Sequence, residues 1–167
     1  MEMAKPERGM MYQPRIGDYG VIKTHGFFGW LIRLGTFSRW NHAIVYVGNG
    51  MAVSADPSGV KKDPITNWDN IAWNQHEELD DNQRMQIVNA ALETVGSHYG
   101  FITIADIAFR ILGLKIFSKA ILDRLARHNG YICSELVAEC YRKGGLVIAE
   151  QDYLCTPGDL AERLIWQ

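Results

Sequence analysis

The chain has 167 residues, 47% of them hydrophobic and 22% charged, a composition typical of one soluble globular domain with its own core. Its net charge of −2, without any block of basic residues, argues against a nucleic-acid partner. The three cysteines are odd in number and match no zinc-binding spacing, which argues against a disulfide framework and against a metal or cofactor site.

The N-terminal part, residues 14–79, is predicted to be rich in strands. The ten residues at the start carry charges and a proline where a signal peptide needs an apolar run, so we expect a cytoplasmic location. Residues 18–24, "DYGVIKT", are typical of a strand. Residues 41–55, "NHAIVYVGNGMAVSA", predict two strands joined by a turn at 48–50. A weaker strand is predicted at 70–75.

From Asp80 onward the apolar residues recur at helical spacing. Asp80 or Asp81 is expected to cap a helix that ends at Gly96. This helix carries one apolar stripe, the pattern of a helix that packs on a core, made of Met85, Val88, Leu92 and Val95.

Further helices are predicted at 101–112, 118–128, 132–143 and 156–164. The apolar stretch 101–125 is interrupted by charged residues and falls short of the roughly 18 uninterrupted apolar residues of a membrane span. Contact with a membrane surface through 101–125 is one expectation, but we favour the alternative that this stretch covers the core. A strand-rich part, 14–79, followed by a helical part, 80–167, predicts a single α+β domain over residues 1–167.

Cys133 stands at the start of the helix predicted from about residue 132. Unpaired N–H groups and the helix dipole at that end stabilise a thiolate, so we expect the pKa of the thiol to fall from about 8.5 toward neutrality. The same N–H groups could hold the oxyanion that forms when a carbonyl is attacked. The alternative is that Cys133 is a small core residue on one apolar face with Leu136, Val137 and Cys140. Position alone favours this alternative.

His42 is the candidate partner base, because it opens the strongly β-prone segment "HAIVYV" and would have a rigid support. The alternative for a lone strand histidine is a structural role. Hairpin register decides which residue could orient the imidazole. A two-residue turn would place Ser54 and Asp56 on the face away from His42, whereas a three-residue loop would pair His42 with Asp56. We hypothesise the second register, with Asp56 orienting His42.

The histidine strand, "WNHAIVYVGNG", stands before the cysteine helix, "YICSELVAECYRKGG". In this order the two segments resemble the circularly permuted members of the NlpC-type papain-like superfamily, which are the bacterial YiiX-like proteins and their relatives of the lecithin retinol acyltransferase type. In ordinary papain-like enzymes the cysteine helix comes first. Shorter agreements spread the resemblance over most of the chain, and they are "RIGDYGVI", "DPSGVKKDPI", "GSHYGF" and "CTPGDLAE".

The resemblance implies a small antiparallel β-barrel or sheet packed against helices, with Cys133 as nucleophile and His42 as base. Relatives often have a glutamate at the position of Ser54. Either Asp56 has taken over the orienting role, or Ser54 holds the imidazole by a hydrogen bond alone.

The function that we favour from the sequence is a cysteine hydrolase that cleaves an amide, ester or thioester through an acyl-enzyme. The resemblance implies a cell-wall peptide or an acyl or lipid group as substrate. The alternatives are an acyltransferase and a bacterial or phage binding module that kept the fold without catalysis, and Ser54 supports the binding module.

Overall fold

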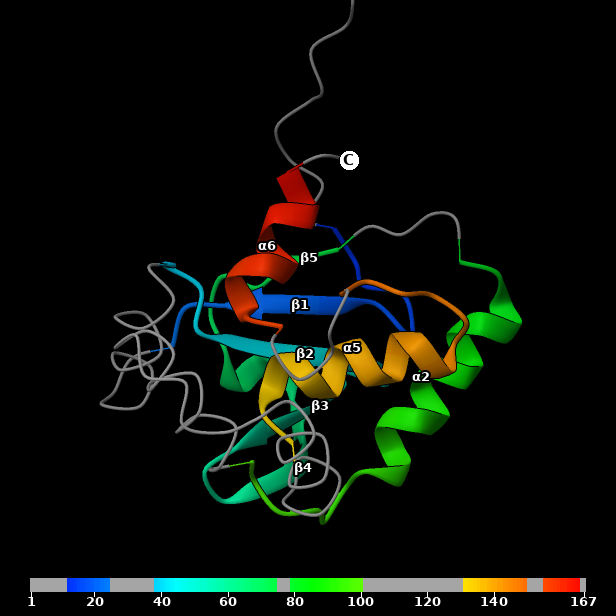
Figure 1. Ribbon diagram of the computed structural model, residues 1–167, viewed down its shortest axis with the longest axis horizontal. Coiled ribbons are helices and arrows are strands. Elements are labelled where there is room, and N and C mark those ends of the chain that lie inside the picture. Colours follow the sequence, from blue (N-terminus) through cyan, green and yellow to red (C-terminus); the bar gives the residue numbers. More distant parts are fainter. Residues whose placement is uncertain (1–11, 25–37, 75–78, 101–130, 150–154, 166–167) are drawn as a thin grey trace, which may run out of the picture.

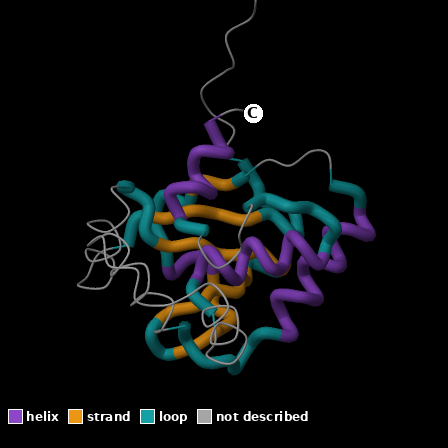
Figure 2. Tube along the Cα trace, viewed as in Figure 1, coloured by secondary structure: helices purple, strands orange, loops and turns teal. Residues whose placement is uncertain are grey.

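The computed structural model describes residues 12–24, 38–74, 79–100, 131–149 and 155–165, and the structural statements below refer to these residues. Figure 1 shows a sheet with helices gathered over one side of it, and Figure 2 marks the same elements by type. In chain order the described elements are β1 (Tyr19–Ile22), β2 (His42–Gly48), β3 (Met51–Asp56), β4 (Gly59–Pro64), a 3-10 helix η1 (Ile65–Asn67), β5 (Ala72–Trp73), α2 (Asp81–Glu93), α5 (Cys133–Lys143) and α6 (Pro157–Ile165).

The strands form one open antiparallel sheet in the order β4-β3-β2-β1-β5. All described strands precede all described α-helices in the chain, which confirms the predicted α+β class. The described strands form an open sheet and not a closed barrel, because β4 and β5 are its two edges. The assignment of residues 1–167 to one domain stays a prediction.

Alternation of side chains along the strands gives the sheet two different faces. The face toward the helices holds the main core, which includes Val45 of β2, Val53 of β3 and Leu136 of α5. The opposite face holds a smaller cluster of Ile22, Ile44 and Ala52, partly covered by Ile65, Trp68, Ile71 and Trp73. The helices therefore pack on one face, and the segment between β4 and β5 covers part of the other.

The β2–β3 hairpin combines a two-residue turn with a bulge. Asn49 and Gly50 have φ angles of 54° and 70°, the left-handed conformation that a tight hairpin turn requires at both central positions. Gly48 pairs with Met51, but the register then shifts by one residue, so that Tyr46 pairs with Ala52 and Ile44 with Ser54. Val47 is the extra residue of this bulge. The resulting register is the one predicted for a three-residue loop.

Helix α2 begins as predicted but turns a different face to the core. Asp80 caps it, accepting from the N–H of Gln83 at 2.8 Å, while the Gln83 side chain accepts from the N–H of Asp80. Three residues of the predicted apolar stripe are instead exposed, with exposed fractions of 46% for Met85, 40% for Leu92 and 44% for Val95. The buried residues of the helix are Arg84, Ile87, Val88, Ala90 and Ala91. The helix is rotated relative to the prediction because a buried partner draws Arg84 inward.

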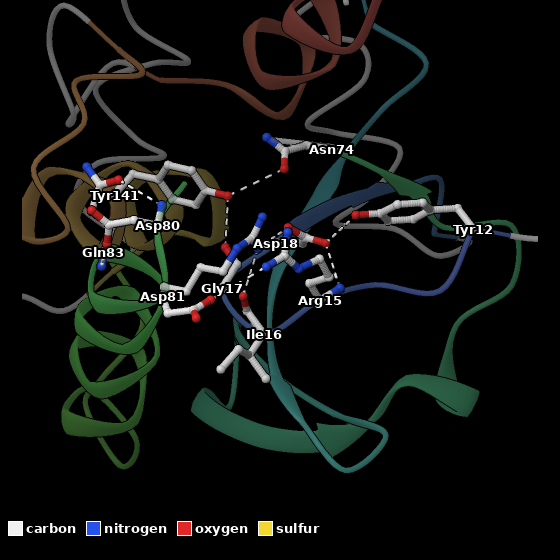
Figure 3. Close-up of polar contacts among 11 residues, drawn as sticks. Tyr12, Arg15, Ile16, Gly17, Asp18, Asn74, Asp80, Asp81, Gln83 and Tyr141 are labelled. Carbon is white, nitrogen blue, oxygen red and sulfur yellow. Dashed lines mark hydrogen bonds and ion pairs between the residues drawn. The ribbon is translucent and has the colours of Figure 1, made fainter. Parts of the chain in front are cut away.

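That partner is Asp18, which is fully buried at the start of β1 and lies 2.7 Å from Arg84. The Asp18 carboxylate also accepts from the Tyr12 hydroxyl at 2.6 Å and from the backbone N–H of Arg15 at 2.7 Å (Figure 3). Arg84 donates in addition to the carbonyl of Ile16 at 3.0 Å. The chain before β1 is thus tied to α2 by charge-assisted hydrogen bonds.

Helix α5 is tied to the same region by Tyr141. Its hydroxyl donates to the carbonyl of Gly17 at 2.8 Å and lies 3.4 Å from the side-chain oxygen of Asn74, as Figure 3 shows. Its ring meets the ring of Tyr19 edge to face, with centroids 5.4 Å apart. These contacts fix α5 across the sheet and so set the direction in which its N-terminus points.

The predicted helices at 101–112 and 118–128, and the proposed membrane contact through 101–125, lie outside the described residues. Among the helices that the structure does describe, none has the length and apolarity needed to cross a membrane.

Candidate active site

Cys133 is the first residue of α5, in the first turn where the sequence predicts it. The preceding residue, Ile132, has an extended backbone, and its N–H donates to the Glu135 carboxylate at 3.3 Å. Ser134 donates through its hydroxyl to the carbonyl of Cys155 at 2.6 Å. The start of the helix is therefore held on both sides of the cysteine, whose exposed fraction is only 2%.

The thiol lies where strands β2 and β3 separate. Both backbone groups of Tyr46 bond toward β1, and because these groups alternate along a strand, the N–H of Ala43 is directed toward β3. The described pairs between β2 and β3 end at Ile44 and Ser54, before Ala43 is reached. The Ala43 N–H instead donates to the sulfur of Cys133. This nitrogen is bonded to the carbonyl carbon of His42, so the thiol lies against the backbone of the histidine strand.

Burial dominates the acidity of the Cys133 thiol. It raises the pKa to about 11, although hydrogen bonds from the N–H groups of Ala43, Ser134 and Cys133 itself act in the opposite direction. The expectation that the helix N-terminus would bring this pKa toward neutrality is therefore wrong. The N–H groups are present as expected, but the loss of water around the sulfur outweighs them.

His42 is the first residue of β2 and is half-buried. Burial lowers the pKa of its imidazole to about 4, and the nearby carboxylate of Asp56 partly offsets this by raising it. The imidazole ring packs against the indole of Trp68, with ring centroids 5.9 Å apart and planes inclined by 41°. His42 is therefore neutral at pH 7, the form in which a histidine can accept a proton.

Asp56 ends β3 at the same end of the sheet. The described β2–β3 pairs end at Ile44 and Ser54, so the predicted pairing of His42 with Asp56 is not among them and stays a prediction. The Asp56 carboxylate accepts from the backbone N–H of Ser58 at 2.7 Å and from the Ser58 hydroxyl. Within the described residues no hydrogen bond joins Asp56 to the imidazole, so its influence on His42 is that of a nearby charge.

Ser54, the alternative orienting residue, is opposite Ile44 and is 3% exposed. By alternation it shares the sheet face of His42, but it is opposite Ile44, two residues further along β2 toward the turn. By alternation along the strands, His42, Ser54 and Asp56 belong to the sheet face of Ile44, whereas Cys133 packs on the opposite face with Ala43 and Val45. Within the described residues no contact joins the imidazole to the thiol.

Tyr99 is a site residue that sequence reasoning did not select. Burial raises the pKa of its hydroxyl above the ordinary range, and the charges of Cys133 and of Asp56 raise it further. Tyr99 bridges to Tyr131, two residues before the nucleophile, and Ser97 accepts from the N–H of Val60 in β4 at 2.9 Å. The only signal in the sequence was the segment "GSHYGF", noted as part of the resemblance.

Among the described residues, no three His, Cys, Asp or Glu side chains gather in a way that could hold a metal ion. Cys140 and Cys155 are buried core residues, as expected for Cys140.

No protein-family model matches this chain, and no curated protein matches it by sequence. By structure the chain is similar to the metalloprotein YiiX of Escherichia coli O157:H7, a DUF1105 protein, in its crystal structure. The TM-score is 0.60 and the identity 20%, and the match covers 83% of this chain and 71% of that chain. At this identity the likeness shows the fold alone. It confirms a YiiX-like α+β fold, whereas the wider assignment to the permuted NlpC-type papain-like superfamily stays a prediction.

Proposed function

We propose that the protein is a cysteine hydrolase with Cys133 as nucleophile and His42 as general base. The observation that carries this proposal is the hydrogen bond from the Ala43 N–H to the Cys133 sulfur. It places a thiol at a helix start against the backbone of a strand that begins with a neutral histidine. A nucleophile needs a base within reach, so the proposal requires that the imidazole at the end of β2 reach the thiol that packs on the other face of the sheet.

The pKa values favour one order of proton movements. At pH 7 the thiol of Cys133, with a pKa of about 11, keeps its proton, and His42, with a pKa of about 4, carries no charge. The imidazole therefore takes the proton while the sulfur–carbon bond forms, which is general-base catalysis and does not require a preformed ion pair. The imidazolium then gives this proton to the leaving amine, alcohol or thiol as its bond to the carbonyl carbon breaks.

The negative charge that develops on the carbonyl oxygen during attack needs hydrogen-bond donors next to the attacking sulfur. The proposed donors are the N–H groups of Cys133 and Ser134 at the helix start and the hydroxyl of Tyr99, on whose pKa the charge of Cys133 acts. Asp56 stabilises the transient imidazolium through its charge, in line with its raising the pKa of His42. Water, activated by His42, releases the acyl group in the second half of the reaction.

The substrate class in this proposal is an amide, ester or thioester, from a cell-wall peptide or an acyl or lipid group. If an alcohol or amine takes the place of water in the second step, the same site performs acyl transfer.

A panel of activated acyl probes tests the proposal. Aryl ester, thioester and anilide probes should acylate Cys133 of the native protein, as located by peptide mass spectrometry. Labelling should persist in Cys140→Ala and disappear in Cys133→Ala. A panel in which no probe labels Cys133 faster than Cys140 would contradict the hydrolase assignment.

The second candidate is a binding module that has lost catalysis. One observation favours it: the carboxylate of Asp56 is engaged by the N–H and hydroxyl of Ser58. The resemblance adds that Ser54 stands where relatives often have a glutamate. A module of this kind would show a Cys133 that reacts with no probe while the fold is intact.

A further inference from the structure

The imidazole of His42 has no hydrogen-bonding partner among the described residues. The residue expected to orient it, Asp56, directs its carboxylate to the N–H and hydroxyl of Ser58. A general base must nevertheless be held in one rotamer to accept a proton efficiently. Packing must therefore supply the orientation that hydrogen bonding does not.

We propose that Trp68 is the positioning residue of His42, and that its indole holds the imidazole in place and keeps it neutral. This inference rests on the proposed role of His42 as base. The contact is direct, with ring centroids 5.9 Å apart.

Trp68 is itself firmly placed. It follows η1, and its N–H donates to the carbonyl of Ile65 at 3.2 Å. The N–H of Ile65 in turn donates to the carbonyl of Gly50 in the hairpin turn at 2.9 Å. The indole packs against the cluster of Ile22, Ile44 and Ala52 on the sheet face of the imidazole. The hairpin that carries His42 thus also anchors the residue that covers it.

Two opposite effects of an indole on an imidazole can be separated. An indole excludes water and so favours the neutral ring, but its π face also attracts a cation and so favours the charged ring. The pKa of His42 is lowered by burial, which indicates that exclusion of water prevails. The charged group that acts on the ring is Asp56, which favours protonation, while Cys133 and Tyr99 at the same end are uncharged at pH 7.

The test is an NMR titration of the His42 ring in the native protein, in Trp68→Leu and in Trp68→Phe. Trp73→Leu is the matched control. Trp73 covers the same small cluster, but its ring centroid lies 5.8 Å from that of Tyr46, and among the described ring pairs it does not contact His42. We expect Trp68→Leu to move the pKa of His42 from about 4 toward the ordinary 6.5. Trp68→Phe should give an intermediate value, and Trp73→Leu should leave it within a few tenths of the native value.

An unchanged or lowered pKa in Trp68→Leu, or an equal shift in Trp73→Leu, would overturn the proposal. If Trp68→Leu does not fold, Trp68→Phe and Trp73→Phe provide the same comparison with smaller changes. The titration is independent of Cys133 reactivity. A protein whose Cys133 is inert but whose His42 shifts as expected would therefore remove the hydrolase function and leave the packing role of Trp68 intact.

Discussion

His42 links the site to the stability of the fold through its lowered pKa. Between pH 6.5 and pH 4 the unfolded chain binds a proton at this residue and the folded chain does not. Because the unfolded state binds more protons, the free energy of unfolding must fall as the pH falls through this window and level off below it. At about 1.4 kcal/mol per pKa unit, the loss is on the order of 3 kcal/mol.

Urea unfolding of the native protein and of His42→Gln at several pH values measures this contribution. The native protein should lose more stability than the variant between pH 6.5 and pH 4. Equal losses in the two proteins would show that the folded protein protonates His42 as readily as the unfolded chain does.

Tyr99 allows a second prediction at the scale of single residues. The charges of Cys133 and Asp56 act on the pKa of its hydroxyl, and the proposed site uses this hydroxyl as an oxyanion donor, whose loss typically lowers a rate by about 100-fold or more. Tyr99→Phe should therefore slow acylation of Cys133 by the reactive ester probe by at least about 10-fold while the protein stays folded. Tyr131→Phe, a neighbouring tyrosine outside this interaction, is the control. Equal rates in native protein and Tyr99→Phe would leave Tyr99 with a packing role only.

The hairpin between β2 and β3 sets the site at the scale of elements. A two-residue turn at Asn49 and Gly50 alone would not pair Ile44 with Ser54, and the extra residue Val47 shifts the register so that they pair. Local turn chemistry was readable from the sequence. The bulge was not, because it depends on the pairing of β2 with both of its neighbours.

Asn49 tests the turn. At φ 54° a residue with a branched side chain is strained by about 1–2 kcal/mol, whereas glycine is not. Asn49→Val should lower the free energy of unfolding by about that amount, and Asn49→Gly should leave it nearly unchanged. Chemical denaturation measures both, and equal stabilities for the two variants would contradict the turn conformation.

At the scale of the whole molecule, the buried pair of Arg84 and Asp18 ties α2 to the chain before β1. Removing one partner leaves a buried charge alone, which destabilises by about 3–5 kcal/mol. Arg84→Met should do so, and Asp18→Asn in the same chain should restore part of the loss. The control is Arg15→Met, because the pair of Arg15 with Asp81 is exposed and is worth less than about 1 kcal/mol. Denaturation midpoints that fall equally in both single variants would be inconsistent with the buried pair.

Much of the architecture was predictable, because local patterns carry it. The alternation at 41–55 and the apolar face around Leu136 predicted β2, β3 and α5. Strand β4 was missed because "GVKKDP" has little apolar alternation, and its two lysines are exposed on an edge strand. The buried face of α2 was missed because Arg84 is drawn inward by Asp18, 66 residues away.

The candidate site, too, has parts that the sequence predicts and parts that it does not. Cys133 at a helix start and His42 at a strand start could be located from the sequence, since both depend on element boundaries. The electrostatic effect on Tyr99 and the contact with Trp68 depend on segments far apart in the chain. The high pKa of Cys133 depends on how much water the folded protein excludes. Long-range packing therefore determines the parts that sequence reasoning missed.

The pairing of Cys133 with His42 is tested most directly by the rate at which iodoacetamide alkylates Cys133, followed by peptide mass spectrometry at pH 7. A neutral imidazole that takes the thiol proton should accelerate this reaction by about 100-fold or more. We predict that His42→Gln is alkylated at Cys133 about 100-fold more slowly than the native protein, with the slower alkylation of Cys140 as internal reference. Cys133 reacting equally fast in the native protein and in His42→Gln would contradict the nucleophile–base pair.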